Sequence, residues 1–493
     1  MIILTQTENQ HDENNQDNNH ENKNKSGIHT FKTSQLWLFA LLTIFITVII
    51  TVSATLFVSH KLSGLDADQR DDISKIENVY KTLSDDYYKG TTSNQLTESA
   101  INGMVKSLRD PYSEYMTKDE TESFNEDVSG DFVGIGAEMQ KKDDQIQITS
   151  PMKGSPAEKA GIQPKDVVEK VNGKSVKGKP LESIVKEVRG KKGTTVTLTV
   201  KRGSDSHDIK IKRDKIHVKS VDYETKGDIA ILTINKFQSS TAAELKSAVL
   251  KAHKAGKKDL VLDLRNNPGG LLDEAVKMAN IFIDKYKTVV KLQKGKQTEE
   301  IPAPNDKVKE TENMDVSVLI NEGSASASEV FTGALKDYGI AKVYGSKSFG
   351  KGIVQTTKEF DDGSLLKFTN MKWLTPEGHY IHGKGIKPDV KIDPPAYQSL
   401  NVIPSDETFK QGDQSKHIKT MKVGLKALDY HIDNQSTQYD EELVDAVKAF
   451  QQQHDLDVTG EFNKKTNEKF TQLLVEKAND DDVVLDKLLE RLK

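Results

Sequence analysis

Apolar positions recur every three or four residues in two separate parts of the chain, and this spacing predicts helices in both. The first part, residues 66–128, is predicted to be an N-terminal helical region, which includes Ile73, Ile76 and Leu83 at helical spacing. The second part, residues 413–478, is predicted to be a C-terminal helical module that follows a polar connector. The charged tail beyond it is expected to be peripheral.

Between these helical parts the pattern changes twice. Residues 129–215 contain short β-rich runs that alternate with turns, so they predict a small, mostly-β domain. Residues 220–395 alternate buried-strand patterns with helical ones, and this alternation predicts an α/β core, a sheet with parallel strands and flanking helices. The expected strands of this core include Ile229–Ile234, Leu260–Leu264 and Val316–Ile320.

A longer apolar run near the start of the chain, Leu36–Val58, contains no charged residue. At about 1.5 Å per residue a helix of this length would span a bilayer core of about 30 Å, so we expect a transmembrane helix. A cleaved signal peptide is the alternative, but the apolar run is longer than the usual signal sequence. Residues 1–35, rich in Asn, Asp, Glu and Lys, are expected to be a disordered leader.

Basic residues on the two sides of this run predict its orientation. Three lysines precede it, and fewer basic residues follow it closely: Lys23, Lys25 and Lys32 against Lys61 and Arg70. This bias favours a cytoplasmic N-terminus. The expected localisation is therefore the cell membrane, with a single span and the large C-terminal part outside the cytoplasm.

Composition removes several classes of function. The 493 residues carry a net charge of -5 from 70 basic and 75 acidic side chains, so nothing favours a nucleic-acid partner. The chain has no cysteine, which excludes disulfides, thiolate catalysis and cysteine-bound metals. Its 12 histidines form no metal-binding spacing, and we expect neither a metal nor an organic cofactor.

Three serines lie close together after one of the predicted strands. The stretch Gly323–Glu329 contains Ser324, Ser326 and Ser328 and opens a helical pattern. Ser326 and Glu329 also fit the capping box of an ordinary helix. The two interpretations are compatible, because a helix N-terminus presents free N–H groups to a developing oxyanion. On the residues alone, each of the three serines is a candidate nucleophile.

One lysine follows between two glycines. Lys351 lies in Phe349–Gly352, after the next apolar run, whereas the nearby Lys347 lacks the glycine frame. A serine hydroxyl needs a base to become a nucleophile, and a lysine can be that base if burial lowers its pKa from about 10.4. The pair is typical of a Ser–Lys hydrolase.

Three motifs in order resemble the carboxyl-terminal processing peptidases, also known as tail-specific proteases. They are Asp263–Gly270, Gly323–Glu329 and Phe349–Gln355, and Leu108–Ser113 fits the same family. The resemblance covers roughly residues 70–395. It implies a serine peptidase of the Ser–Lys type.

The resemblance also implies roles for six residues. Ser326 is the implied nucleophile and Lys351 the general base, with Gln355 orienting the lysine amine. The N–H groups of Ala327 and Gly270 are the implied oxyanion donors. A sixth residue of this candidate site, Asp337, matches a family position but lies about 16 Å from the nucleophile if the helix is continuous, so we expect a structural role.

The mostly-β region resembles a PDZ domain. Phe132–Met139 contains the Gly-Ile-Gly-Ala segment that lies where such domains bind a peptide's terminal carboxylate. Glycines there let consecutive N–H groups turn toward one anion, and the next strand pairs with an extended peptide. The implied peptide-binding residues are Ile135, Gly136 and Ala137. A simple glycine turn between strands is the alternative.

The C-terminal module is similar to small three-helix peptidoglycan-binding modules. The resemblance rests on Phe450-Gln451, a glycine turn within Leu456–Phe462, and Thr466. Peptidoglycan is thus a candidate partner, and a generic helical bundle is the alternative.

Two further patterns suggest other chemistry. Gly345–Lys351 fits a phosphate-binding loop, but Gly352 replaces the serine or threonine that would hold Mg²⁺, which argues against an NTPase. His379 and His382 are expected to be solvated loop histidines rather than members of a Ser-His-Asp triad.

The sequence as a whole predicts a membrane-anchored serine endopeptidase with a Ser–Lys mechanism. We expect it to cleave extracytoplasmic proteins whose free C-termini the PDZ domain recognises. The alternative is a catalytically silent PDZ and cell-wall scaffold, against which intact Ser326, Lys351 and Gln355 argue.

Overall fold

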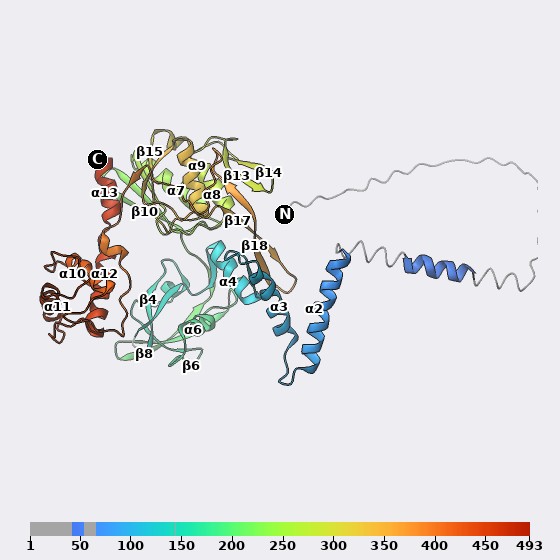
Figure 1. The fold of residues 1–493 in the computed structure, drawn as a ribbon, viewed down its shortest axis with the longest axis horizontal. Helices are drawn as coiled ribbons and strands as arrows, with labels where there is room; N and C mark the ends of the chain where they lie inside the picture. The colour runs from blue at the N-terminus through green and yellow to red at the C-terminus, as the bar shows by residue number, and fades with distance from the viewer. Residues whose placement is uncertain (1–41, 54–65, 143) are drawn as a thin grey trace, which may run out of the picture. The chain divides into compact units, whose positions relative to one another are not determined.

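The computed structural model describes residues 42–53, 66–142 and 144–493 of the chain (Figure 1). The chain divides into two compact units, one up to Thr97 and the other from Glu98 to Lys493. In the first unit, α2 (Ala67–Asp86) begins at a capping box in which Asp66 and Gln69 satisfy each other's backbone N–H groups. Helix α3 (Ser93–Ser107) follows it in the chain.

The predicted localisation needs correction. We expected a membrane-spanning helix over Leu36–Val58, but no helix among the described residues is both long enough and apolar enough to cross a membrane. The parts of the expected span beyond residues 42–53 and the leader, residues 1–35, lie outside the described residues.

A six-stranded sheet forms the centre of the second unit and confirms the predicted α/β core. Its strand order is β10-β11-β12-β15-β16-β19, and all neighbours run parallel except β10 and β11. The inner strands are nearly continuous apolar runs, as expected for a parallel sheet that is buried on both faces. The strands are Val221–Lys226, Ile229–Ile234, Asp259–Asp263, Asp315–Ile320, Ala341–Gly345 and Val390–Lys391.

Helices cover both faces of this sheet. Three of them, α7 (Thr241–Lys254), α8 (Leu272–Ala279) and α9 (Ala327–Asp337), pack with buried strand residues such as Leu260 and Leu262. The alternate strand residues, which point to the other face, pack against α13 (Val483–Leu492). The expectation of a peripheral tail is therefore wrong: α13 stands beside the strands of the core (Figure 1).

An antiparallel sheet lies next to this core. It has the order β1-β18-β13-β14, with β17 also paired to β18. Strand β1 comes from the region that we had predicted to be helical, and it pairs with β18. The strands are Glu114–Met116, Leu365–Leu374, Thr288–Lys294, Gln297–Pro302 and Ile353–Glu359, and the 3-10 helix η1 (Lys309–Asn313) precedes β15.

The predicted mostly-β domain has its own apolar core. Strands β3, β4, β5, β7 and β8 form one sheet, with β6 paired to β5, while β2 pairs with β9. Helix α4 (Lys118–Ser129) leads into it. The other elements are β2 Asp131–Gly134, β3 Ala137–Lys142, β4 Gln145–Pro151, α5 Pro156–Lys159, β5 Val167–Val171, β6 Lys174–Ser175, α6 Leu181–Val188, β7 Thr195–Arg202, β8 Asp205–Lys212 and β9 Asp214–His217.

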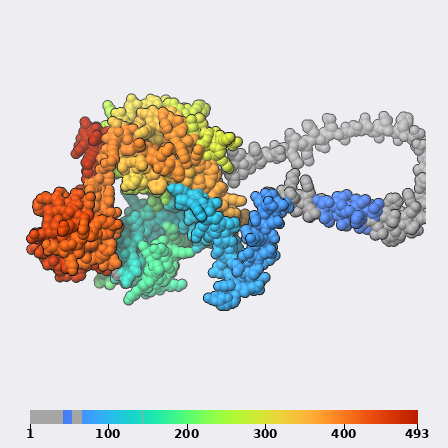
Figure 2. Space-filling model, in the orientation of Figure 1, coloured from blue at the N-terminus to red at the C-terminus, as the bar shows by residue number. Residues whose placement is uncertain are grey.

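The C-terminal region is helical, as predicted. The short 3-10 helix η2 (Ala396–Ser399) precedes α10 (Lys416–Ala427), α11 (Glu441–Gln453) and α12 (Lys464–Asp480). These helices share a core that includes the buried Phe450. Figure 2 shows the red C-terminal end of the chain against the core, apart from the body that these helices form.

Candidate active site

A groove of about 870 Å³ collects the predicted catalytic residues. Loops at the C-terminal ends of β12, β15 and β16 contribute to it, and the carboxyl ends of parallel strands are the usual place for a ligand site in an α/β sheet. Ser326, Ala327, Gly270, Lys351 and Gln355 all line the groove, and β17 forms part of its wall. Asp337 does not line it.

Ser326 differs from its two neighbouring serines in what its hydroxyl can reach. Ser324 Oγ donates to Leu264 O at 2.8 Å, and Ser328 Oγ donates to Asn267 O at 2.9 Å; both residues are fully buried. Ser326 alone is partly exposed and lines the groove. The structure thus leaves one hydroxyl free for chemistry and uses the other two to join the turn to the loop after β12.

The backbone of Ser326 is held in an unusual conformation. Its φ of 56° and ψ of -114° lie outside the regions that a residue with a side chain prefers. Its N–H donates to Glu329 Oε2 at 2.9 Å, while the reciprocal contact to the Ser326 hydroxyl falls short of a cap hydrogen bond. Such local strain is typical of a serine that a sharp strand-to-helix turn presents at an active site.

Two backbone N–H groups are available beside Ser326. Within the described residues, neither the Gly270 N–H nor the Ala327 N–H has a hydrogen-bond acceptor. Gly270 has a φ of 148°, and a Cβ there would lie 2.2 Å from Phe237 O, so only glycine fits. Gly269 also approaches the serine turn closely: a Cβ added at this position would lie 2.8 Å from Ala327 N.

Glu329 is a functional residue that the sequence analysis described only as part of a helix cap. It is buried, and its carboxylate joins the serine turn to the lysine loop. Besides the Ser326 N–H, it accepts hydrogen bonds from Ser348 Oγ at 2.5 Å, Gly350 N at 2.7 Å and Lys351 N at 2.8 Å. The spacing of the motifs could not reveal this contact, because the loop returns from the next strand.

Lys351 lies in an environment that shifts its amine toward the neutral form. Burial lowers the pKa of Lys351, the positive charge of Lys367 lowers it further, and the charges of Asp110 and Glu329 oppose the shift. Its Nζ lies 4.7 Å from the centre of the Tyr112 ring. No hydrogen bond joins Nζ to Ser326 or Gln355 among the described residues, and such contacts often tighten only when substrate binds.

Gln355 enters the groove at an irregularity in β17. The register of β17 against β18 shifts between Val354 and Gln355, which redirects the side chain that follows. Its Nε2 lies 3.5 Å from Thr369 Oγ1, the limit of a hydrogen bond. The structure therefore brings Gln355 into the same groove as Lys351, but among the described residues no hydrogen bond joins it to the amine.

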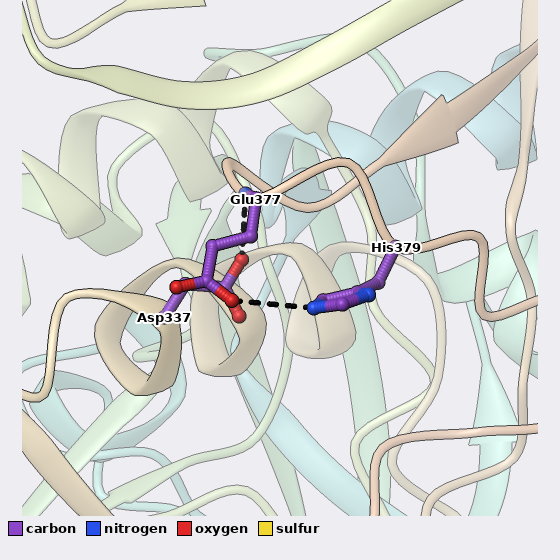
Figure 3. Close-up of side chains that lie close together, drawn as sticks. All are labelled: Asp337, Glu377 and His379. Carbon is purple, nitrogen blue, oxygen red and sulfur yellow. Dashed lines mark hydrogen bonds and ion pairs between the residues drawn. The ribbon is translucent and has the colours of Figure 1, made fainter.

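Asp337 is the last residue of α9 and does not line the groove. Figure 3 shows it beside Glu377 and His379. Its Oδ2 accepts a hydrogen bond from the Glu377 N–H at 2.9 Å, and the Glu377 carboxylate pairs with His379 Nε2 at 3.2 Å. Asp337 thus anchors the turn after β18. The same segment continues to Gly383, whose N–H donates to Gly350 O at 2.9 Å in the lysine loop.

The acidic and histidine groups in Figure 3 have the mutual spacing of metal ligands, within 4.8 Å of one another. Glu377 and His379 are exposed and pair with each other, as surface ion pairs commonly do. The second such group, between α10 and the start of α11, contains the exposed His431 and Asp433 with Glu442. The groove itself contains no such group among the described residues.

The carboxylate-binding loop expected in the PDZ region has the required backbone. Gly136 has a φ of 71°, and a Cβ there would lie 2.5 Å from Ser155 Cβ. Ile135 is buried and its carbonyl accepts from Ala157 N, while Ala137 begins β3. In the part of the chain that the structure describes, the N–H groups of Ile135 and Gly136 donate to no acceptor.

The features that suggested other chemistry have different roles. The segment that resembled a phosphate-binding loop runs into strand β17 rather than a helix, so it lacks the helix N-terminus on which such loops rely. His382 Nδ1 accepts from the Gly352 N–H at 3.3 Å and stacks on Tyr380. It therefore supports the lysine loop.

Four family models match the chain. The model of peptidase family S41 matches residues 228–392, and that of the PDZ domain matches residues 147–202. The activating protease CtpB N-terminal domain matches residues 53–121, and a peptidoglycan binding domain matches residues 414–470.

Relatives cover nearly the whole chain. A CtpA-like serine protease of Staphylococcus saprophyticus is 70% identical over 462 residues, 94% of each protein. One of Staphylococcus aureus strain COL is 70% identical over 451 residues, 92% of this chain and 91% of the relative. A solved photosystem II D1 C-terminal processing protease is 26% identical, covering 67% of this chain and 93% of its own, with a TM-score of 0.38.

The assignment rests on the sequence relatives, because the structural likeness is too low to add to it. The extent of their identity, together with a groove built on the three motifs of Asp263–Gly270, Gly323–Glu329 and Phe349–Gln355, leads to one conclusion. The chain belongs to peptidase family S41 and is a CtpA-like, carboxyl-terminal processing serine protease with a PDZ domain.

Proposed function

We propose that the protease uses a Ser–Lys mechanism. The observation that carries the proposal is the free hydroxyl of Ser326, the one serine of its turn that lines the groove together with Lys351. The other two serines donate to backbone carbonyls at 2.8 Å and 2.9 Å.

The reaction follows from the positions of these groups. Ser326 Oγ attacks the carbonyl carbon of the scissile bond, and the neutral Lys351 amine takes its proton. The Gly270 and Ala327 N–H groups, which have no other acceptor within the described residues, donate to the developing oxyanion. Lys351 then gives the proton to the leaving amine, and water hydrolyses the acyl-enzyme.

We propose that the PDZ domain selects substrates by their free C-termini. The Ile135 and Gly136 N–H groups are suited to a terminal carboxylate, and the exposed edge of β3 after Ala137 is suited to an extended peptide. For the C-terminal module, the matching family model supports peptidoglycan as a ligand.

Alanine variants of the three serines test the mechanism. Ser326→Ala should reduce cleavage of a protein with a free apolar C-terminus by roughly 10⁴-fold or more, with the fold intact. Ser328→Ala, which removes a buried hydroxyl of the same turn, is the matched control and should remain active. ATP should have no effect on either.

A different pattern would contradict the proposal. If Ser326→Ala kept activity while Ser324→Ala lost it without unfolding, the nucleophile would be Ser324. If all variants and the wild type were inactive on every protein substrate, the silent scaffold would be favoured instead.

A further inference from the structure

The last helix of the chain reaches the base of the candidate oxyanion loop. Arg265 follows β12 and begins the loop that ends at Gly270. Its side chain is only 19% exposed. Nε and Nη2 donate to both oxygens of Asp263, at 2.6 to 3.1 Å, so the guanidinium is fixed on one side by its own strand.

Asp482 fixes the guanidinium of Arg265 on the other side. Nη1 donates to Asp482 Oδ1 at 2.7 Å and Nη2 to Oδ2 at 2.6 Å, a bidentate pair across more than 200 residues of sequence. Bidentate arginine–carboxylate pairs combine strength with a defined orientation. The same carboxylate caps α13, because Oδ1 accepts from the Leu485 N–H at 3.0 Å.

An apolar contact holds α13 in place. Its buried face packs on the side of the catalytic sheet that α7, α8 and α9 leave free, and Figure 2 shows this end of the chain against the core. The helix contributes Val484, Leu485, Leu488 and Leu489, and the sheet contributes Ile229, Ile231, Val261, Leu319, Tyr344 and Ile392. The position of Asp482 is therefore set by the core itself.

The loop after Arg265 is connected directly to the nucleophile turn. The Asn266 N–H donates to Asn321 Oδ1 at 2.8 Å, and the Asn267 carbonyl accepts from Ala325 N at 3.0 Å. Gly269 lies against Ala327 N, as described above. A shift of the guanidinium would be passed to the segment that carries the Gly270 N–H, because this segment is short and bonded at each step.

We infer that Asp482 is a positioning residue for catalysis, which orients the oxyanion loop through Arg265. This inference rests on the proposed function, since it assumes that the Gly270 N–H stabilises the transition state. It assigns α13 a role in catalysis, although the peptidoglycan-binding module separates this helix from the catalytic core in the sequence.

Asparagine and glutamate variants of Asp482 test the inference in the full-length protein. Asp482→Asn keeps an oxygen that caps α13 but removes the charge and the bidentate pair. We expect kcat to fall roughly 10-fold or more, since small displacements of a catalytic group reduce the rate steeply, while KM stays unchanged. Asp482→Glu, which keeps the carboxylate, should lose less activity.

A matched control lies on the same helix. Asp486→Asn removes an exposed carboxylate that pairs with Lys226 at 3.3 Å and does not contact the loop, so kcat should not change. Rates are compared at a temperature at which all variants are folded by circular dichroism, so that reduced stability alone would not lower kcat.

The outcomes separate the inference from the function on which it rests. Activity in Ser326→Ala would overturn the proposed mechanism. If Ser326→Ala is inactive and Asp482→Asn has the kcat of the wild type, the mechanism stands and the positioning role of Asp482 is wrong. A decrease that Asp486→Asn shares equally would also overturn it.

Discussion

Lys351 must lose its proton before it can act as a base, and the residues around it act in opposite directions. Burial and the nearby Lys367 lower the pKa of Lys351, while the carboxylates of Asp110 and Glu329 raise it. The lowering effects of burial and of Lys367 are the larger, so the pKa of Lys351 is lowered overall. The Glu329 carboxylate accepts four hydrogen bonds, so part of its charge is already satisfied by N–H and O–H groups when it faces the amine.

The activity should therefore rise with pH. At a pH below the lowered pKa of Lys351 the amine is protonated and cannot accept the serine proton, so kcat/KM should rise as pH increases through that pKa. Lys351→Arg should be as inactive as Lys351→Ala, because arginine stays protonated. A pH profile of peptide cleavage checks both, with the exposed Lys347→Arg as control. An active Lys351→Arg variant would mean that another group is the base.

Glu329→Gln should impair both the fold and the reaction. The amide would present N–H groups where the carboxylate now accepts from Gly350 N and Lys351 N, leaving at least one buried donor unpaired. We expect a loss of about 1–3 kcal/mol in the free energy of unfolding, measured with urea, and a lower kcat. Glu322→Gln, which alters an exposed side chain of the same turn, should change neither the free energy of unfolding nor kcat. Unchanged kcat in folded Glu329→Gln would refute the positioning role.

The sequence could predict residues whose motif is local. Ser326, Lys351 and Gly270 lie in short glycine-framed stretches, and they meet because parallel strands deliver them to one edge of the sheet. The contact of Glu329 with the lysine loop spans two elements and leaves no local signal. The expected hydrogen bond from Gln355 to the amine is not formed, since the bulge in β17 places the side chain near Thr369.

At the scale of elements, the loop between α3 and β1 contributes Pro111 and Tyr112 to the groove. Asp110 accepts from Ser113 Oγ at 2.6 Å and from Tyr112 N at 3.0 Å, and Ser113 Oγ accepts from the Thr369 N–H at 3.1 Å in β18. These bonds fix the loop, and its tyrosine ring then lies over the amine of Lys351.

Replacement of Tyr112 should change the pH profile. A cation over a ring face is stabilised, so the ring favours the protonated lysine and keeps its pKa from falling further. Tyr112→Leu keeps apolar bulk but removes this attraction, and we expect the rise of kcat/KM to begin at a lower pH. Tyr112→Phe keeps the ring and should titrate like the wild type. Identical pH profiles for Tyr112→Leu and the wild type would show that the Tyr112 ring does not influence the pKa of Lys351.

The prediction missed the elements that pack against distant parts of the chain. The strands and helices of the core follow their periodicity closely, but α13 was described as a peripheral tail. Its apolar residues recur at Val484, Leu485, Leu488 and Leu489, a helical stripe that the surrounding charges obscured. The stripe alone does not predict that α13 covers the sheet, because the position of α13 depends on the arrangement of the whole core.

At the scale of the molecule, charged contacts connect the PDZ domain to the helix that leads into it. Arg189, at the end of α6, pairs with Glu126 of α4 and lies 5.0 Å from the Phe132 ring in β2. Lys186 pairs with Asp119 on the same two helices, but this pair is exposed. Because β2 ends at the proposed carboxylate-binding loop, these contacts connect that loop to α4.

The PDZ domain should therefore control the rate as well as select the substrate. Amidating a substrate's C-terminus removes the carboxylate, and we expect kcat/KM to fall roughly 10-fold, a typical coupling between two sites. Gly136 is a poor position for the matching variant, because its φ of 71° and the close Ser155 would strain any side chain. Arg189→Met is better, since it keeps apolar contact with Phe132 but breaks the pair with Glu126.

Arg189→Met should reduce the discrimination between free and amidated substrates, measured as the ratio of their kcat/KM values. Lys186→Met breaks the exposed pair between the same helices and should leave that ratio unchanged, since such pairs contribute little. A ligand can shift an equilibrium only by its differential affinity for the two states, so a PDZ domain that gates cleavage must tell the two substrates apart. If the wild type cleaves both at the same rate, the domain neither selects nor gates, and the proposed C-terminal specificity is wrong.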